Sequence, residues 1–143
     1  MLEFIRSIFG EIRKLTSNPT IINGTVTANW NSGVATSGLP GADLLNLGAV
    51  GEWMILTEIY LRLASFNAGA TVTVRAYLQM MGAEQLVMDE DYVVAAEPAV
   101  IPLFLWIFFV AYFIYGPVRI EVFSDQAADD GLAAPYEYRY RPS

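Results

Sequence analysis

The 143-residue chain is long enough for one domain with a single core, and it contains neither cysteine nor histidine. This excludes disulfides, zinc sites with sulfur or imidazole ligands, cysteine nucleophiles and a Ser-His-Asp triad. Eight basic against fifteen acidic residues give a formal net charge of −7, which disfavours binding to nucleic acid. Apolar residues make up 55% of the chain, so many must be buried in a core, a bilayer or an interface between subunits.

An amphipathic helix is predicted over residues 1–17, ending at Asn18-Pro19. Its apolar positions alternate spacings of four and three, as in a coiled-coil seam: Met1, Ile5, Ile8, Ile12 and Leu15. Isoleucine in both seam positions favours trimers, although two heptads are too short to be stable alone. The helix packs on its own domain or serves docking or oligomerisation. We divide the chain into this N-terminal helix, residues 1–18, and a β-domain, residues 19–143.

Alternation with a period of two replaces the helical period after Pro19. It predicts strands over 20–30, 53–65, 71–80, 85–94, 118–124 and 136–141, with a hairpin turn at residues 67–70 and another at 81–83. Residues 31–51 are expected to form a long loop with a short helical turn at 42–47, and residues 125–134 a polar loop. With the segment discussed next, about seven mostly antiparallel strands predict an all-β fold, an antiparallel β-sandwich or jelly roll.

Residues 98–118 carry no charge before Arg119. Their length and hydropathy are compatible with a membrane-spanning helix over 99–116. Aromatic and β-branched residues dominate the segment, however, and Trp106 and Tyr112 would lie well inside the bilayer. The flanking β-patterns also favour one or two strands that are apolar on both faces.

A strand with two apolar faces needs a second cover in so small a domain, and the N-terminal helix or other copies of the chain can supply it. Covering some 800 Å² is worth on the order of 20 kcal/mol before ordering costs, at about 25 cal/mol per Å². We therefore predict a homo-oligomer. Its interface residues are Ile5, Ile8, Ile12, Leu15, Leu103, Leu105, Ile107, Phe109 and Phe113.

Other constellations carry weaker signals. Three carboxylates within 125–130 are candidates for calcium, and Asp89-Glu90-Asp91 is a weaker one, although loops of this kind usually serve turn chemistry and solubility. The tyrosines of 136–141, with Tyr60 and Tyr77, could form a carbohydrate-binding or protein-contact face, but cross-strand packing is the commoner role. Nothing places carboxylates in a pocket, so we expect no catalytic residues, metal site or cofactor.

Several stretches resemble a group of small β-sandwich virion proteins of tailed phages and related viruses. They are Gly41-Ala42-Asp43-Leu44-Leu45 with Gly48 and Gly51, residues 71–77, residues 118–122 running into 124–131, and Tyr136-Glu137-Tyr138. The resemblance implies a structural role in capsid decoration or in a tail or fibre.

We therefore expect a non-enzymatic viral structural protein, a capsid decoration or cement subunit located on the virion. It would assemble with itself, as a trimer in the first instance, through strand 101–115 and the N-terminal helix. Its other partners would be the major capsid protein or other virion proteins, with no role for nucleic acid and none favoured for a membrane. The alternatives are a subunit of an extracellular or tail filament, a membrane-anchored β-domain with a helix at 99–116, and a carbohydrate-binding module.

Overall fold

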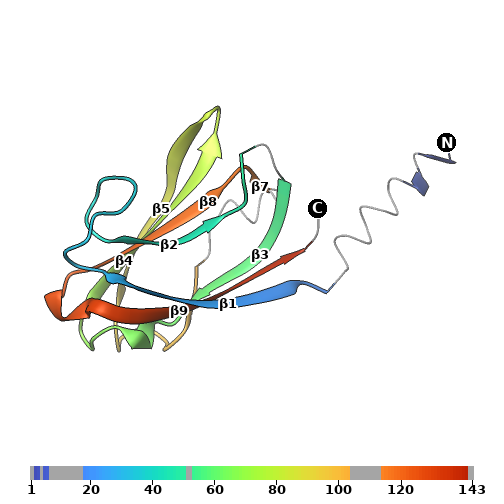
Figure 1. Cartoon of the computed structure of the whole chain (residues 1–143). Helices are drawn as coiled ribbons and strands as arrows, with labels where there is room; N and C mark the ends of the chain where they lie inside the picture. Colours follow the sequence, from blue (N-terminus) through green and yellow to red (C-terminus); the bar gives the residue numbers. More distant parts are fainter. Residues whose placement is uncertain (1, 4, 7–17, 51–52, 104–113, 142–143) are drawn as a thin grey trace.

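Two antiparallel sheets stack on each other in the computed structural model, which describes residues 2–3, 5–6, 18–50, 53–103 and 114–141 (Figure 1). The first sheet has the order β1-β9-β3-β6, and β7 also pairs with β3. Its strands are β1 (Thr20–Asn29), β9 (Asp130–Arg141), β3 (Trp53–Leu61), β6 (Ile101–Pro102) and β7 (Ile114–Tyr115). The prediction of an all-β antiparallel sandwich is confirmed at this level.

The second sheet has the order β2-β8-β4-β5. It consists of β2 (Ala42–Leu47), β8 (Val118–Ser124), β4 (Thr71–Met80) and β5 (Ala83–Val93). Two short 3-10 turns complete the described elements, η1 (Leu63–Ser65) after β3 and η2 (Ala127–Asp129) before β9.

The strands pair in a nested order. If the two-residue β7 is left aside, the first strand pairs with the last, β2 with β8, β3 with β6 and β4 with β5. Successive pairs alternate between the two sheets, as if one long antiparallel ribbon had been rolled up. All pairings are antiparallel, so the ribbon needs no helical crossover.

The core lies between the sheets and takes every second residue of the central strands. On β4 and β8 these residues are Val72, Val74, Ala76, Leu78, Val118, Ile120 and Val122, all buried. Trp30, directly after β1, closes one end of the core: its ring packs edge-on against Phe66 at 5.8 Å, and its indole nitrogen donates to the Leu132 carbonyl at 2.7 Å. Alternation predicts an inward face of Val72, Val74, Ala76, Leu78 and Met80 on β4 and of Val118, Ile120 and Val122 on β8. The structure confirms this except for Met80, which is 37% exposed at the end of β4.

Two predicted boundaries were wrong. Residues 42–47 form strand β2, where a loop with a helical turn was expected. A bulge between Asp43 and Leu45 breaks the alternation there, and β2 is stabilised by pairing with β8, far away in sequence. The last strand starts at Asp130, six residues earlier than predicted, because β1 extends far enough to pair with its first half.

A bulge between Leu56 and Glu58 also changes the faces of β3. Leu56, Ile59 and Leu61 belong to the core cluster. Ile55, which alternation predicts on the same face as Ile59 and Leu61, lies on the other side of the bulge, where it pairs with Arg141 and is fully buried. A single inserted residue reverses the facing of every side chain before it, which alternation alone could not predict.

The N-terminal helix stays a prediction, because most of residues 1–17 lie outside the described part of the chain; Leu2, Glu3, Ile5 and Arg6 are helical. Within the described residues, no helix has the length and apolar composition needed to span a membrane. A helix covering all of 99–116 does not form, because Ile101–Pro102 and Ile114–Tyr115 are extended and pair with β3.

Candidate functional site

The outward face of the second sheet carries a buried ionic network. Arg75 comes from β4, and Arg119 and Glu121 come from β8. All three occupy positions that alternate with core residues, so they point away from the core. They are nevertheless buried, and the Glu121 side chain is 0% exposed. Something must therefore cover this face of the sheet.

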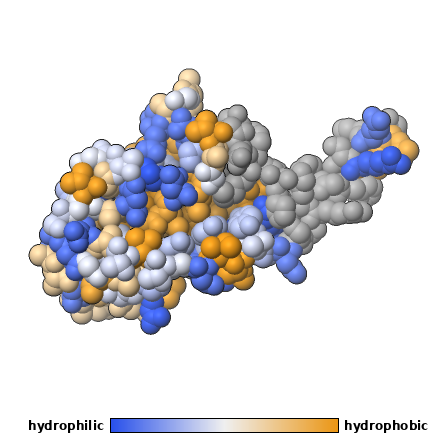
Figure 2. All heavy atoms as spheres, viewed as in Figure 1, coloured by the Kyte–Doolittle hydropathy of each residue, from blue (hydrophilic) through white to orange (hydrophobic). Residues whose placement is uncertain are grey.

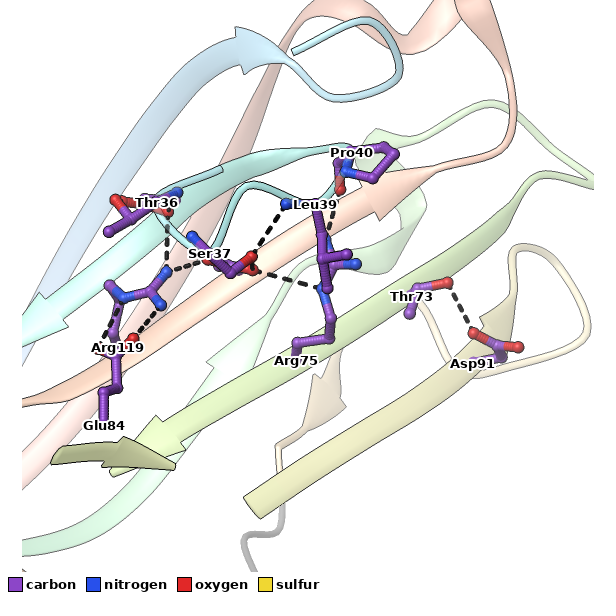
Figure 3. A network of polar contacts seen from close by, with 11 residues as sticks. Thr36, Ser37, Leu39, Pro40, Thr73, Arg75, Glu84, Asp91 and Arg119 are labelled. Carbon is purple, nitrogen blue, oxygen red and sulfur yellow. Dashed lines mark hydrogen bonds and ion pairs between the residues drawn. The ribbon is translucent and has the colours of Figure 1, made fainter. Parts of the chain in front are cut away.

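The cover is the loop between β1 and β2, which folds back over the sheet as a small hairpin (Figure 3). Ser37 donates to Glu121 twice, from its backbone nitrogen at 2.9 Å and from its hydroxyl at 2.7 Å. The Pro40 carbonyl accepts a hydrogen bond from Arg75. Gly41 closes the loop at φ +120°, and a Cβ at that position would overlap the Val122 carbonyl.

Arg119 is the centre of the ion pairs. It contacts Glu121 and Glu84, and its guanidinium lies 3.2 Å from Asp43. The same guanidinium stacks over the Tyr77 ring at 4.4 Å. Glu121 is also 3.4 Å from the guanidinium of Arg75, so this carboxylate bridges two arginines.

The pKa values follow from these contacts. Burial alone would raise the pKa of Glu121, but hydrogen bonds from Arg119 and Ser37 outweigh it and lower the pKa below its ordinary value of 4.5. The hydrogen bond to Glu84 raises the pKa of Arg119, against the effect of burial. Arg119 and Glu121 therefore both stay charged at neutral pH.

This network is arranged to hold the loop on the sheet. Its carboxylates already accept hydrogen bonds from arginines and from the hydroxyls of Thr36 and Ser37. Among the described residues, no group of three or more acidic side chains is arranged to hold a metal ion.

The loop 124–131 is the stronger calcium candidate. Its three carboxylates accept hydrogen bonds from backbone amides of the same chain. Asp125 accepts from the Thr71 amide at 2.9 Å, and Asp129 from the Asn67 amide at 2.8 Å. Asp130 accepts from the amides of Asn31 and Ser32, and hydrogen bonds from the Ser32 side chain and from these amides lower its pKa. Two of the carboxylates thus bind the turn that leads into β4, and the third binds the loop after β1. In the weaker candidate, Asp91 accepts from the Thr73 hydroxyl.

The tyrosines do not share one face. Tyr136, Tyr138 and Tyr140 form a stack along β9 that packs against the core, with ring centroids 6.4 and 6.1 Å apart. Tyr60 lies on the opposite face of the same sheet, beside Arg139, and Tyr77 lies on the outward face of the other sheet. A single carbohydrate-binding platform made of all five is therefore not formed.

One apolar hollow lies beside η1 at the end of β5. It has a volume of about 250 Å³ and is lined by residues that include Leu63, Phe66, Val94, Pro98 and Ala99. Glu97 is the only ionisable group in its lining. Apolar side chains also occur singly on the described surface, interspersed with polar ones on the face seen in Figure 2.

Of the predicted interface residues, Leu103 lies in the core of the single chain and is 2% exposed, and Ile5 is 39% exposed. The others, Ile8, Ile12, Leu15, Leu105, Ile107, Phe109 and Phe113, lie outside the described residues. The network around Arg119 was not predicted. Its only signal in the sequence was the presence of Arg75, Arg119 and Glu121 at outward positions of strong strand patterns, which ordinarily face water.

No protein-family model, curated protein or solved structure matches the chain.

Proposed function

We propose that the chain is a non-enzymatic structural subunit of a virus particle, a capsid decoration or cement protein, and that its sandwich is a jelly roll. The strand order carries this proposal. First pairs with last, second with next to last, and the pairs alternate between two four-strand paths, β1-β9-β3-β6 and β2-β8-β4-β5. This is the order expected of an eight-stranded ribbon rolled into two sheets, an architecture used by viral capsid domains.

The ionisable clusters bind the chain's own loops: Glu121 holds Ser37, and Asp129 holds Asn67. The hollow beside η1 offers one carboxylate and no second group to act with it. Fold alone does not define function, so the proposal also depends on the assembly surface.

The apolar segment 101–115 supplies that surface. Its two ends, β6 and β7, both pair with β3. Between these pairings β3 advances six residues, from Met54 to Tyr60, whereas the segment advances twelve, from Pro102 to Ile114, so the pairings do not belong to one continuous ladder. An uncharged, aromatic-rich sequence thus connects β6 and β7, which pair with the two ends of the same strand, β3. We propose that copies of the chain cover it, with the N-terminal helix as a further contact, and that the particle's major capsid protein or another virion protein is the docking partner.

Light scattering and electron microscopy of the purified chain test this function. We expect a closed oligomer, in the first instance a trimer, and expect Phe109→Asp to dissociate it. Leu86→Asp, at an exposed position on β5, is the matched control and should leave the oligomer intact. A wild-type chain that stays monomeric at high concentration would contradict the proposal.

The filament alternative is distinguished by symmetry. A subunit of a tail or extracellular filament would form open helical polymers instead of closed rings, because its contacts are head-to-tail and do not close. A chain that leaves the expressing cell's membrane fraction only with detergent would instead favour the membrane-anchored alternative. Both outcomes would overturn the decoration role.

A further inference from the structure

Strand β1 forms one edge of the first sheet. It has ten residues, and among the described strands it pairs only with β9. In an antiparallel ladder, every second residue directs its N–H and C=O away from its neighbour. The free side of β1 is therefore a row of backbone donors and acceptors that another strand can use.

The strand also lacks the sequence features that usually prevent another strand from pairing with a sheet edge. It contains no charged residue and no proline. From Ile21 onward its residues alternate between exposed and half-buried, and the exposed ones are Ile21, Asn23, Thr25, Thr27 and Asn29. Ile21 is 50% exposed. Charged side chains, proline and shortness are common ways to prevent edge pairing, and β1 has none of them; the irregularity in its pairing with β9 lies near its end, between Thr27 and Asn29.

The other edges are blocked. β5 carries the acidic run Asp89-Glu90-Asp91. β2 has only six residues and a bulge at Asp43. The edge of β3 is occupied at both ends by β6 and β7. β1 is thus the longest free and uncharged edge in the described part of the chain.

We propose that β1 pairs antiparallel with β1 of a second copy of this chain, which joins the two first sheets into one continuous sheet. The inference rests on the proposed self-assembly and adds to it a two-fold contact, which is separate from the contacts within a trimer. The partner is a second copy because of charge and length. Two copies that each carry a net charge of −7 repel, and they approach most easily where neither presents a carboxylate. In a second copy, β1 also has ten residues, so the two strands can pair along their whole length.

The pairing is two-fold symmetric, so each copy contributes the same surface. Residues opposite one another across a ladder lie on the same face of the sheet, so exposed residues meet exposed residues. With the two-fold axis at Thr25, Thr25 lies beside its own copy and Asn23 lies beside Thr27. Neighbouring threonines form favourable cross-strand pairs, whereas like charges opposite one another are destabilising.

Charge substitutions at Thr25 test the contact. We expect Thr25→Lys to raise the dimer dissociation constant at least about tenfold in sedimentation equilibrium, and Thr25→Asp to do the same. A one-to-one mixture of the two variants should restore the dimer, because opposite charges then face each other. Gln85→Lys, at an exposed position of edge strand β5, is the matched control and should leave association unchanged.

Amide hydrogen exchange gives a second readout that needs no variant. Protection of residues 20–29 should rise with protein concentration, while that of residues 83–93 should not. Larger wild-type species that are unaffected by Thr25→Lys, with no concentration-dependent protection of β1, would overturn this contact and leave the proposed function standing. A wild-type chain that is monomeric at every concentration would overturn both.

Discussion

The ring of Tyr136 occupies the space that a side chain at Gly24 would need. The two residues are cross-strand partners of β1 and β9, and a Cβ built on Gly24 would lie 2.9 Å from Cε1 of the ring and closer still to Cζ. The ring also stacks on Tyr138, with an interplanar angle of 14°. Glycine at position 24 thus allows the tyrosine stack of β9 to lie flat over the backbone of the edge strand.

Gly24→Ala is therefore expected to lower the free energy of unfolding by about 1–3 kcal/mol, because the ring must leave its stacked position. In a Tyr136→Ala background the same substitution should raise stability by about 0.5–1 kcal/mol, since alanine is then preferred to glycine in a strand. Urea denaturation of the four proteins measures this double-mutant cycle. The same loss in both backgrounds would show that the ring is not the cause.

Glu121 is expected to be the most sensitive member of the buried network. Glu121→Gln leaves Arg75 and Arg119 without the carboxylate that bridges them, and breaking a buried ion pair costs about 3–5 kcal/mol. The control is Glu84→Gln, which removes a half-exposed partner of Arg119 and should cost about 0–1 kcal/mol. Chemical denaturation at neutral pH compares the two. If both substitutions lowered the free energy of unfolding equally, burial of the carboxylate would not determine how much each ion pair contributes to stability.

The same carboxylate predicts a pH dependence. Its pKa in the folded chain lies below the ordinary value of 4.5, so it stabilises the fold above that pH. The stabilisation is lost as the pH falls from about 4.5 through the lower pKa of the folded state. In that window the wild type should lose up to about 1.4 kcal/mol per pH unit more than Glu121→Gln. Parallel stability curves for the two proteins would contradict the assignment.

Asp129 holds η2 against the loop before β4. Asp129→Ala leaves the Asn67 amide without its acceptor and is expected to cost about 1–3 kcal/mol. Amide exchange of residues 67–70 should accelerate at the same time. Asp125→Ala, which removes an exposed acceptor of the Thr71 amide, is the control and should cost no more than about 1 kcal/mol.

Calcium provides a separate check on this loop. The carboxylates of 125–130 accept amide hydrogen bonds from the turn before β4 and from the loop after β1, and binding a cation would require them to give up these bonds. Millimolar calcium chloride should therefore leave the thermal midpoint of the wild type unchanged. A clear increase that chelator reverses would restore the calcium hypothesis.

The turn between β4 and β5 is strained at Met81. Met81 and Gly82 both have positive φ, 51° and 78°, in a two-residue hairpin loop that favours Asn-Gly. Met81→Asn is expected to raise the free energy of unfolding by about 1 kcal/mol, because asparagine adopts this conformation more readily. Met80→Asn, one residue earlier and inside the strand, should give no gain. Thermal denaturation distinguishes the two positions.

The local pattern of side chains was sufficient to predict much of this molecule. Alternation along β4, β8 and β9 identified the faces of those strands, because one face of each is buried and a period of two is the only way to keep it so. The turns at 67–70 and 81–83 are predicted by their glycines between two alternating stretches, and alternation places Tyr138 and Arg139 on opposite faces of β9.

Tertiary structure alone decided the rest. Pairing with a distant strand turned residues 42–47 into β2, and bulges at Asp43 and Thr57 moved neighbouring side chains to new faces, which no local period contains. The ionic network exists because the loop 31–41 folds over Arg75 and Glu121 and removes them from water. Charged residues at the outward positions of a strand pattern are expected to be exposed to solvent. Here a loop from elsewhere in the chain covers them, and this contact, which the local pattern does not contain, makes them a buried cluster.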